Sequence, residues 1–318
     1  MNVVAAALTA LLAIAAALPL RQVADVPLPG NASRLDYQSL DEKRHMLFVA
    51  HLGDGSVIAL DTRRMRVAGV VPGVSQVHGV LAVPARDRVY ASATGTNELV
   101  AIDEATLRVT GRVGAGTYPD GIAYDPNTGR LFVSDERGAA DTVVDAKSFR
   151  AVASIPLGGE VGNTQYDPQT RHVFVNAEGA NALVEIDPRS LRILGRTALP
   201  GCAGNHGLLV DARRFFIACE DNAMLVAVDR QSMRITGRWS VGEDPDVLAL
   251  DARAGTLYVA SESGIVSVFH SGNSVTKIAQ GVLAPHAHTV AIDSAARLLY
   301  FPLEDAGGRP VLRVMEPR

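Results

Sequence analysis

The chain has little cysteine and little lysine, and it lacks the short motifs of several common chemistries. Its 318 residues include two cysteines and three lysines and carry a net charge of −4. No P-loop, G-x-S-x-G, H-E-x-x-H or C-x-x-C-H motif and no convincing dinucleotide fingerprint occurs, so the usual signs of nucleotide, serine-hydrolase, zinc-protease and haem chemistry are missing. Because no basic face for phosphate groups is apparent, nucleic acid is not an expected partner.

Long apolar segments are also scarce. Residues 1–17 are apolar and uncharged, and Ala15-Ala16-Ala17 offers an A-x-A cleavage site. This pattern predicts a signal peptide over 1–17 and a periplasmic or secreted protein. The segment lacks a Lys or Arg, however, and a wrongly chosen start codon or a short membrane anchor would look similar. No later segment reaches the roughly 18 apolar residues of a membrane-spanning helix, so we expect no transmembrane span in the mature chain.

The sequence does contain a repeat of 42 residues. One aromatic residue recurs at this spacing in seven copies, without a slip: Phe48, Tyr90, Phe132, Phe174, Phe216, Tyr258 and Tyr300. Each copy contains four short runs rich in Val, Ile, Leu and Ala, which are typical of strands. Four strands of this length form one blade, and a blade buries both faces only by packing on its neighbours. We therefore predict an all-β fold, a seven-bladed β-propeller with four-stranded blades.

Aspartates in the same register predict the turns. The third strand of five copies ends at an aspartate with Ser or Thr three residues later in most copies: Asp61, Asp103, Asp145, Asp187 and Asp229. The hairpin after the first strand carries its own aspartate in Asp125, Asp167, Asp251 and Asp293. Such side chains bond the N–H groups of their own turn. We expect these turns to form one mouth of the central channel and to have few polar atoms left for a ligand.

The chain termini predict how the ring closes. The last copy ends at Arg318 after its third strand (311–314), whereas residues 21–28 precede the first inner strand and belong to no earlier copy. We therefore predict that the N-terminal strand completes the last blade, which leaves no unpaired edge. Because the repeat runs through residues 18–318, we expect a single domain over this range and a monomer.

The strand motifs also resemble a known family. LFVA, RLFVS, HVFVN and TLYVA, with runs like V-x-[IV]-D about ten residues later, resemble the YVTN family of bacterial propellers over residues 21–318. The resemblance implies the propeller fold. It implies no single function, because such propellers serve in ligand binding, in cell-surface interaction and, in some relatives, in metal-assisted catalysis.

Titratable residues occur where the loops lead into the innermost strands, at the mouth opposite the aspartate turns. This strand-start position holds, in chain order, Asp36, His78, Asp120, Gly162, His206, Asp246 and His288. Imidazole and carboxylate groups are ordinary metal ligands and acid–base groups, and a ring brings them near one axis. Together with His51, at the end of a second strand on the same face, the six titratable residues are the predicted ligand-binding set. The alternative is that they bond loop N–H groups.

The segment His286-Ala-His288 suggests a metal site within this ring. Residues two apart on an extended segment project to the same face, and Pro285 favours extension. With Asp36 and His78 from neighbouring blades they form the candidate ligand set for a divalent metal ion: Asp36, His78, His286 and His288. An H-x-H motif alone is weak, so this set depends on the ring.

Glutamates form a second ring at the same mouth. They recur four residues after the repeat aromatic as Glu136, Glu178, Glu220, Glu262 and Glu304. They would make the rim negative and attractive to cations. Alternatively they bond loop N–H groups of a neighbouring blade.

Cys202 and Cys219 also fall on this face, both in blade five. In an exported protein a pair of cysteines in adjacent loops is more often a disulfide than a metal site. We predict the disulfide, with free thiols as the alternative.

Two functions fit these observations. The first is an exported propeller that binds a small ligand, a metal ion or a protein partner at the channel mouth. The second is a metal-dependent lyase or hydrolase, in which some of the histidines hold a divalent ion and Asp36 or Asp246 acts as ligand or base. The identity of the ligand, and whether the chain is an enzyme, stay open at this point.

Overall fold

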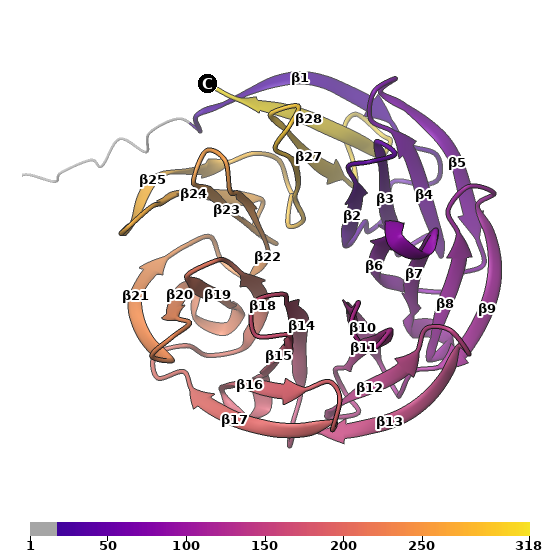
Figure 1. The fold of residues 1–318 in the computed structure, drawn as a ribbon. Coiled ribbons are helices and arrows are strands. Elements are labelled where there is room, and N and C mark those ends of the chain that lie inside the picture. Colours follow the sequence, from indigo (N-terminus) through magenta and orange to yellow (C-terminus); the bar gives the residue numbers. More distant parts are fainter. Residues whose placement is uncertain (1–17) are drawn as a thin grey trace, which may run out of the picture.

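The computed structural model describes residues 18–318, which form seven sheets arranged in a ring around one axis (Figure 1). Each sheet has four antiparallel strands, and six of the sheets take their strands from consecutive segments of the chain. The predicted all-β, seven-bladed propeller is confirmed. The predicted signal peptide, residues 1–17, lies outside the described residues. Within residues 18–318, no helix has the length and apolar character needed to cross a bilayer.

Each blade runs in chain order from the axis outward. Blades one to three contain β2 (Gln38–Asp41), β3 (Met46–His51), β4 (Ser56–Asp61) and β5 (Arg66–Pro72); β6 (Val77–Val83), β7 (Arg88–Ala93), β8 (Glu98–Asp103) and β9 (Arg108–Gly114); and β10 (Pro119–Asp125), β11 (Arg130–Asp135), β12 (Ala140–Asp145) and β13 (Arg150–Pro156). Blades four to six contain β14 (Val161–Asp167), β15 (His172–Ala177), β16 (Ala182–Asp187) and β17 (Arg192–Ala198); β18 (Asn205–Val210), β19 (Arg214–Cys219), β20 (Met224–Asp229) and β21 (Arg234–Ser240); and β22 (Pro245–Asp251), β23 (Thr256–Ser261), β24 (Ile265–Ser271) and β25 (Val275–Val282). Short 3₁₀ helices lie between strands at η1 (Pro84–Arg86), η2 (Thr94–Thr96), η3 (Glu178–Ala180) and η4 (Glu220–Asn222).

Blade seven joins the two ends of the chain. It contains β26 (Ala291–Asp293), β27 (Leu298–Leu303), β28 (Val311–Pro317) and, as its outer strand, β1 (Leu20–Pro27). β1 pairs antiparallel with β28 from Leu20 opposite Pro317 to Pro27 opposite Val311, and Figure 1 shows the indigo β1 alongside the yellow β28. Arg313 also donates to both carboxylate oxygens of Asp25, at 2.9 and 2.7 Å. The predicted closure by the N-terminal strand is confirmed.

The repeat aromatics form the core between blades. All seven lie on the second strand of their blade and are at most 2 % exposed. Phe48 of blade one, for example, packs with Val80 and Val89 of blade two. The 42-residue period therefore arises because each blade repeats the same contact with the next.

The repeat aspartates hold the turns as predicted. Asp145 accepts hydrogen bonds from the N–H and the hydroxyl of Ser148, both at 2.7 Å, and these bonds lower the pKa of its carboxyl group. Asp125 accepts the N–H of Asn127 at 2.9 Å in the hairpin after the first strand. The polar atoms of these turns are thus occupied by their own backbone.

A disulfide joins Cys202 to Cys219, with 5.3 Å between the two Cα atoms. Cys219 ends β19, and Cys202 lies in the loop that leads into β18. Both cysteines are buried among apolar side chains that include Leu199 and Phe215. The bond therefore ties a loop at the channel mouth to the second strand of the same blade.

Removal of residues 18–27 is expected to destabilise the protein strongly. It would leave β28 as an open edge and would expose surface now covered by Leu20 and Val26, which are 4 % and 6 % exposed. Burial of each such side chain contributes about 1.5–3 kcal/mol, so a loss of at least about 3 kcal/mol and partial aggregation are expected in chemical denaturation. Val23→Ala, at an exposed position of the same strand, is the control. An unchanged midpoint in the trimmed protein would contradict closure by β1.

The disulfide gives a second prediction. Protein isolated from its native compartment and unfolded without reductant should contain no thiol that reacts with iodoacetamide, as mass spectrometry would show. The double variant Cys202→Ser/Cys219→Ser should lose about 3 kcal/mol of unfolding free energy, because the bond closes a loop in the unfolded chain. Two alkylated cysteines in wild-type material would count against both the bond and export.

Candidate functional site

Strand-start side chains from several blades meet at one mouth of the channel. Asp36, His78, Asp120, His206 and Asp246 line a cavity of about 420 Å³ there, which we call the acidic chamber. Four of them are the second residues of β6, β10, β18 and β22, and Asp36 lies two residues before β2. The sequence predicted this convergence from the repeat register alone.

Glycines allow the inner strands to approach one another at this level. Gly79, Gly121 and Gly207 each directly follow a strand-start residue. A Cβ atom on Gly79 would lie 2.1 Å from the carbonyl oxygen of Asp120, and one on Gly207 would lie 2.0 Å from that of Asp246. Because no side chain fits at these distances, glycine is required for the spacing. The close strands in turn bring side chains of different blades within hydrogen-bonding distance.

Tyr37 spans the channel at the floor of the acidic chamber. It belongs to blade one, but its hydroxyl donates to Asp246 Oδ1 of blade six at 2.9 Å and accepts from Asn163 Nδ2 of blade four at 2.7 Å. The same oxygen lies 3.2 Å from His206 Nε2 of blade five. Burial, together with the carboxylates of Asp246 and Asp120, raises the pKa of Tyr37 well above its usual value, so the phenol stays neutral.

Tyr37 was not identified from the sequence, although a signal was present. It directly follows a strand-start residue, at the position that is glycine in three other blades, where Gly79, Gly121 and Gly207 stand. A single aromatic ring among glycines at one level of a channel has room to cross it. Comparing the copies at this second register position would have found it.

Carboxylates dominate the acidic chamber. Seven of them line it: Asp36, Asp120, Glu136, Glu220, Asp244, Asp246 and Glu262. Among the described residues of this lining, Arg34 is the only Lys or Arg; its Nε lies 3.3 Å from Asp36 Oδ2, and its Nη2 binds Glu262 Oε1 at 2.6 Å. Burial raises the pKa of Glu220 to about 8, and the nearby carboxylates of Asp246 and Glu178 add to the shift. The chamber therefore gathers seven carboxyl groups in one buried volume, and burial opposes the ionisation of several of them.

His206 is surrounded by acidic side chains. Its Nδ1 lies 2.7 Å from Glu178 Oε1 and 3.7 Å from Glu220 Oε1, and its Nε2 lies 3.7 Å from Asp120 Oδ2. Burial alone would lower the pKa of His206, but Glu220 and Glu178, with Asp246, raise it well above the usual value. His206 is therefore an imidazolium that offsets part of the chamber's negative charge.

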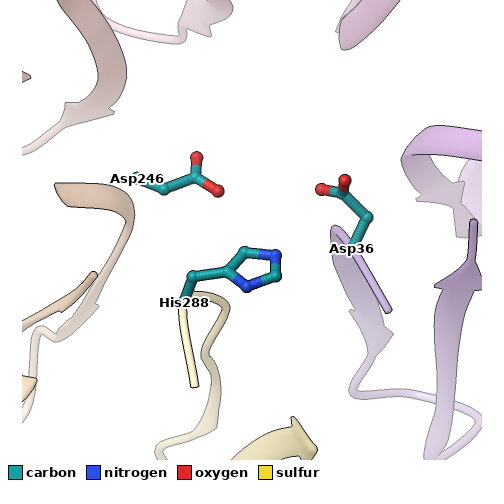
Figure 2. A group of neighbouring side chains, drawn as sticks. All are labelled: Asp36, Asp246 and His288. Atoms are coloured by element: carbon teal, nitrogen blue, oxygen red, sulfur yellow. The ribbon is translucent and has the colours of Figure 1, made fainter. Parts of the chain in front are cut away.

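A buried group of three side chains lies beside the chamber. Asp36, Asp246 and His288 each offer one ligand atom, and these atoms lie within 4.8 Å of one another. All three residues are buried, and the imidazole of His288 points toward the space between the two carboxylates (Figure 2). A second group with the same spacing is Glu178, His206 and Glu220, but there the histidine Nδ1 already bonds Glu178.

The structure separates three predicted histidines from this group. His78 Nδ1 bonds the carbonyl oxygen of Gln76, and its Nε2 lies 3.2 Å from the hydroxyl of Tyr118, so both nitrogens have partners. His286 adopts a left-handed conformation with φ of 54°, and its side chain is 60 % exposed. The segment is therefore not extended as expected, although Nδ1 of His286 and Nδ1 of His288 lie 3.9 and 3.3 Å from the same oxygen, Glu262 Oε2. His51 is fully buried behind the mouth, where its Nε2 bonds the hydroxyl of Ser33.

The predicted glutamate ring is only partly in the acidic chamber. Glu136, Glu220 and Glu262 line it, and Glu178 contacts it through His206. Glu304 is not part of the lining; it lies near His51. Gly162 occupies the remaining strand-start position because a Cβ there would lie 2.6 Å from the Cα of His206.

The opposite part of the channel forms a second cavity, larger than the acidic chamber. It has a volume of about 730 Å³ and shares Tyr37 and Asp246 with the acidic chamber. Most of its lining is apolar, and its polar side chains are largely engaged: Gln165, for example, bonds the carbonyl oxygen of Leu208 and the N–H of Val210. The expectation that this side has few free polar atoms agrees with these contacts, but the side is not closed by its turns.

No family model matches the chain, and no curated protein matches it in sequence. Solved structures match its fold. Hydrazine synthase from Kuenenia stuttgartiensis has a TM-score of 0.75 at 14% identity, over 90% of this chain and 96% of that chain. Virginiamycin B lyase from Staphylococcus aureus has 0.75 at 12%, over 93% and 98%, and the WD40 repeats of RRP9 have 0.78 at 10%, over 96% and 99%. At these identities the likeness establishes the propeller fold alone.

Tyr37→Phe tests whether the floor of the chamber depends on one hydroxyl. The variant leaves the Asn163 amide without its acceptor and Asp246 Oδ1 without its donor, so a loss of about 1–3 kcal/mol in unfolding free energy is expected. Tyr118→Phe, which removes a half-buried hydroxyl from the same chamber, should cost less than about 1 kcal/mol. Equal losses in the two variants would contradict the role of Tyr37.

Proposed function

We propose that this chain is an exported, monomeric propeller of the YVTN type that binds a small positively charged ligand in the acidic chamber. The observation that carries the proposal is the composition of the lining: seven carboxyl groups stand against two cationic side chains, the guanidinium of Arg34 and the imidazole of His206. Burial raises the pKa values of Asp120, Glu136 and Glu220, and repulsion from neighbouring carboxylates adds to the shifts. A bound cation would relieve both.

Three observations support the family and the compartment. The apolar residues 1–17 with their A-x-A site are typical of a signal peptide. The disulfide between Cys202 and Cys219 suits an oxidising compartment. The strand motifs that resemble the YVTN family lie on the second strand of the blades, as in RLFVSD of β11.

The proposal predicts that cation binding strengthens as pH rises. Zn²⁺ and 1,4-diaminobutane are suitable probes, titrated calorimetrically into the purified protein at pH 6 and pH 9. The carboxyl group of Glu220, with its pKa of about 8, is protonated at the lower pH and must lose its proton to attract a cation. We expect affinity to rise at least fivefold over this range for both probes, with protons released on binding.

Glu220→Gln should weaken both probes at pH 9 and flatten the pH dependence. His206, Glu178, Asp244 and Asp246 face this carboxyl group and remain in the variant. The matched control is Asp87→Asn. The side chain of Asp87 is 66 % exposed in the loop between β6 and β7, at the opposite mouth of the channel. If neither probe binds the wild type, or if Glu220→Gln binds both probes as tightly as Asp87→Asn does, there is no cation site in this chamber.

A metal-dependent lyase or hydrolase is the second candidate, and one observation favours it. The hydroxyl of Tyr37 lies between Asp246 and His206 on the chamber floor, so a neutral phenol adjoins both an imidazolium and a carboxyl group. Such groups can pass a proton to or from a bound molecule. If the chain is an enzyme, His206→Gln abolishes turnover while Zn²⁺ still binds; if it is a binding protein, no turnover of candidate substrates is seen with either form.

A further inference from the structure

We infer that Asp36, Asp246 and His288 form a binding site for one divalent transition-metal ion. This inference rests on the proposed function, because it names the cation and its place beside the acidic chamber. It differs from the ligand set expected from the sequence, since Asp246 takes the place of His78 and His286.

The hydrogen bonds of His288 leave one nitrogen free for a metal. Its Nδ1 lies 3.0 Å from the carbonyl oxygen of His286 and 3.3 Å from Glu262 Oε2. A carbonyl oxygen only accepts hydrogen bonds, so Nδ1 carries the hydrogen. In the neutral imidazole Nε2 then presents a lone pair. This is the arrangement in which metal-binding histidines are usually held, with the second nitrogen bonded to a backbone carbonyl or carboxylate.

The free nitrogen has no partner within the described part of the chain. His288 is 1 % exposed, and its Nε2 has neither a hydrogen-bond partner nor contact with solvent. A buried polar atom without a partner is costly and rare. Figure 2 shows the ring directed at the space between Asp36 and Asp246, so Nε2 faces two carboxyl groups. A cation between them would satisfy all three groups.

The spacing suits a metal ion. Because the three ligand atoms lie within 4.8 Å of one another, some point lies no more than about 2.8 Å from each (4.8 Å divided by √3). Metal–nitrogen and metal–oxygen bonds are about 2.0–2.2 Å, so each side chain needs to move inward by about 0.7 Å or less. Asp246 is already oriented by the hydroxyl of Tyr37. Three protein ligands leave positions on the ion for water or for a molecule in the chamber.

The ligand types indicate the class of metal. Ca²⁺ and Mg²⁺ prefer oxygen ligands, and an imidazole nitrogen disfavours both. The group contains no thiolate, which disfavours Cu⁺. Two carboxylates and one imidazole suit Zn²⁺, Mn²⁺, Fe²⁺ or Co²⁺.

Arg34 occupies the position of a competing cation. Its Nε lies 3.3 Å from Asp36 Oδ2, and its side chain is 40 % exposed, so it can move away from the carboxylate. A guanidinium next to a ligand repels an incoming metal ion. Removal of this charge should therefore tighten metal binding. A site in which the guanidinium of Arg34 itself contacts the ligand would instead lose affinity.

The test is calorimetric titration of the purified, chelator-treated protein with Zn²⁺ and Mn²⁺, with Mg²⁺ for comparison. We expect one Zn²⁺ per chain, weaker or absent Mg²⁺ binding, and a loss of about 100-fold or more in Zn²⁺ affinity in His288→Gln and Asp246→Asn. Arg34→Gln should bind Zn²⁺ about tenfold more tightly. His286→Ala and the exposed His270→Ala should bind as the wild type does. Thermal unfolding of each variant without metal shows which of them are folded.

A direct readout complements the affinities. In the Co²⁺-loaded protein, anomalous scattering should place the ion between Asp36, Asp246 and His288, even if one variant fails to fold. An ion at Glu178, His206 and Glu220 instead, or full affinity in His288→Gln, overturns this site but leaves a cation site in the chamber intact. If 1,4-diaminobutane binds but Zn²⁺ does not, the metal site is overturned and the cation site in the acidic chamber stands. If neither probe binds, the proposed function fails as well.

Discussion

The pairing of β1 with β28 is the contact on which the site geometry depends. It joins the first and last segments of the chain, and residues 28–37 lead directly from β1 to the channel mouth. Asp36 and Tyr37 lie at the end of this segment, whereas His288 belongs to blade seven. The buried group therefore spans the junction between blade one and the last two blades. A ring that failed to close there would still contain folded blades but would not bring these side chains together.

Aspartates have opposite environments, and opposite pKa shifts, at the two ends of the strands. Aspartates in the outer turns accept N–H and hydroxyl groups, and the pKa of Asp145 is lowered by its bonds to Ser148. Aspartates at the mouth are buried among other carboxylates, and burial raises the pKa of Asp120 well above its usual value. Asp120 Oδ1 has no hydrogen-bond partner in the described structure. The turn aspartates Asp145 and Asp125 thus have hydrogen-bond partners, whereas Asp120 at the mouth retains one buried oxygen without a partner.

The repeat made much of this architecture predictable, because the 42-residue period records identical contacts between blades. It located the strand-start residues, the aspartate turns and the closing strand. It did not reveal Tyr37, whose role follows from the absence of side chains at Gly79 and Gly121. It also misplaced His286, because the left-handed turn at that residue is a local departure from the extended path expected after Pro285. A repeat predicts the contacts that all blades share, whereas the candidate site is formed by residues that differ from blade to blade.

The likeness to other propellers does not choose between binding and catalysis, because proteins as different as a lyase and a WD40 domain share this ring. Whether the protein only binds or also catalyses depends on how the buried group of Asp36, Asp246 and His288 acts together with the acidic chamber. Asp246 connects them, since it belongs to the buried group and also accepts the hydroxyl of Tyr37, which lies 3.2 Å from His206. An ion bound to Asp246 would withdraw charge from that hydrogen bond and make the phenol a better proton donor. If a cation binds at Asp246, its binding would therefore be coupled to proton transfer by Tyr37 through this one carboxyl group, and the proposed binding site would contain the groups that catalysis needs.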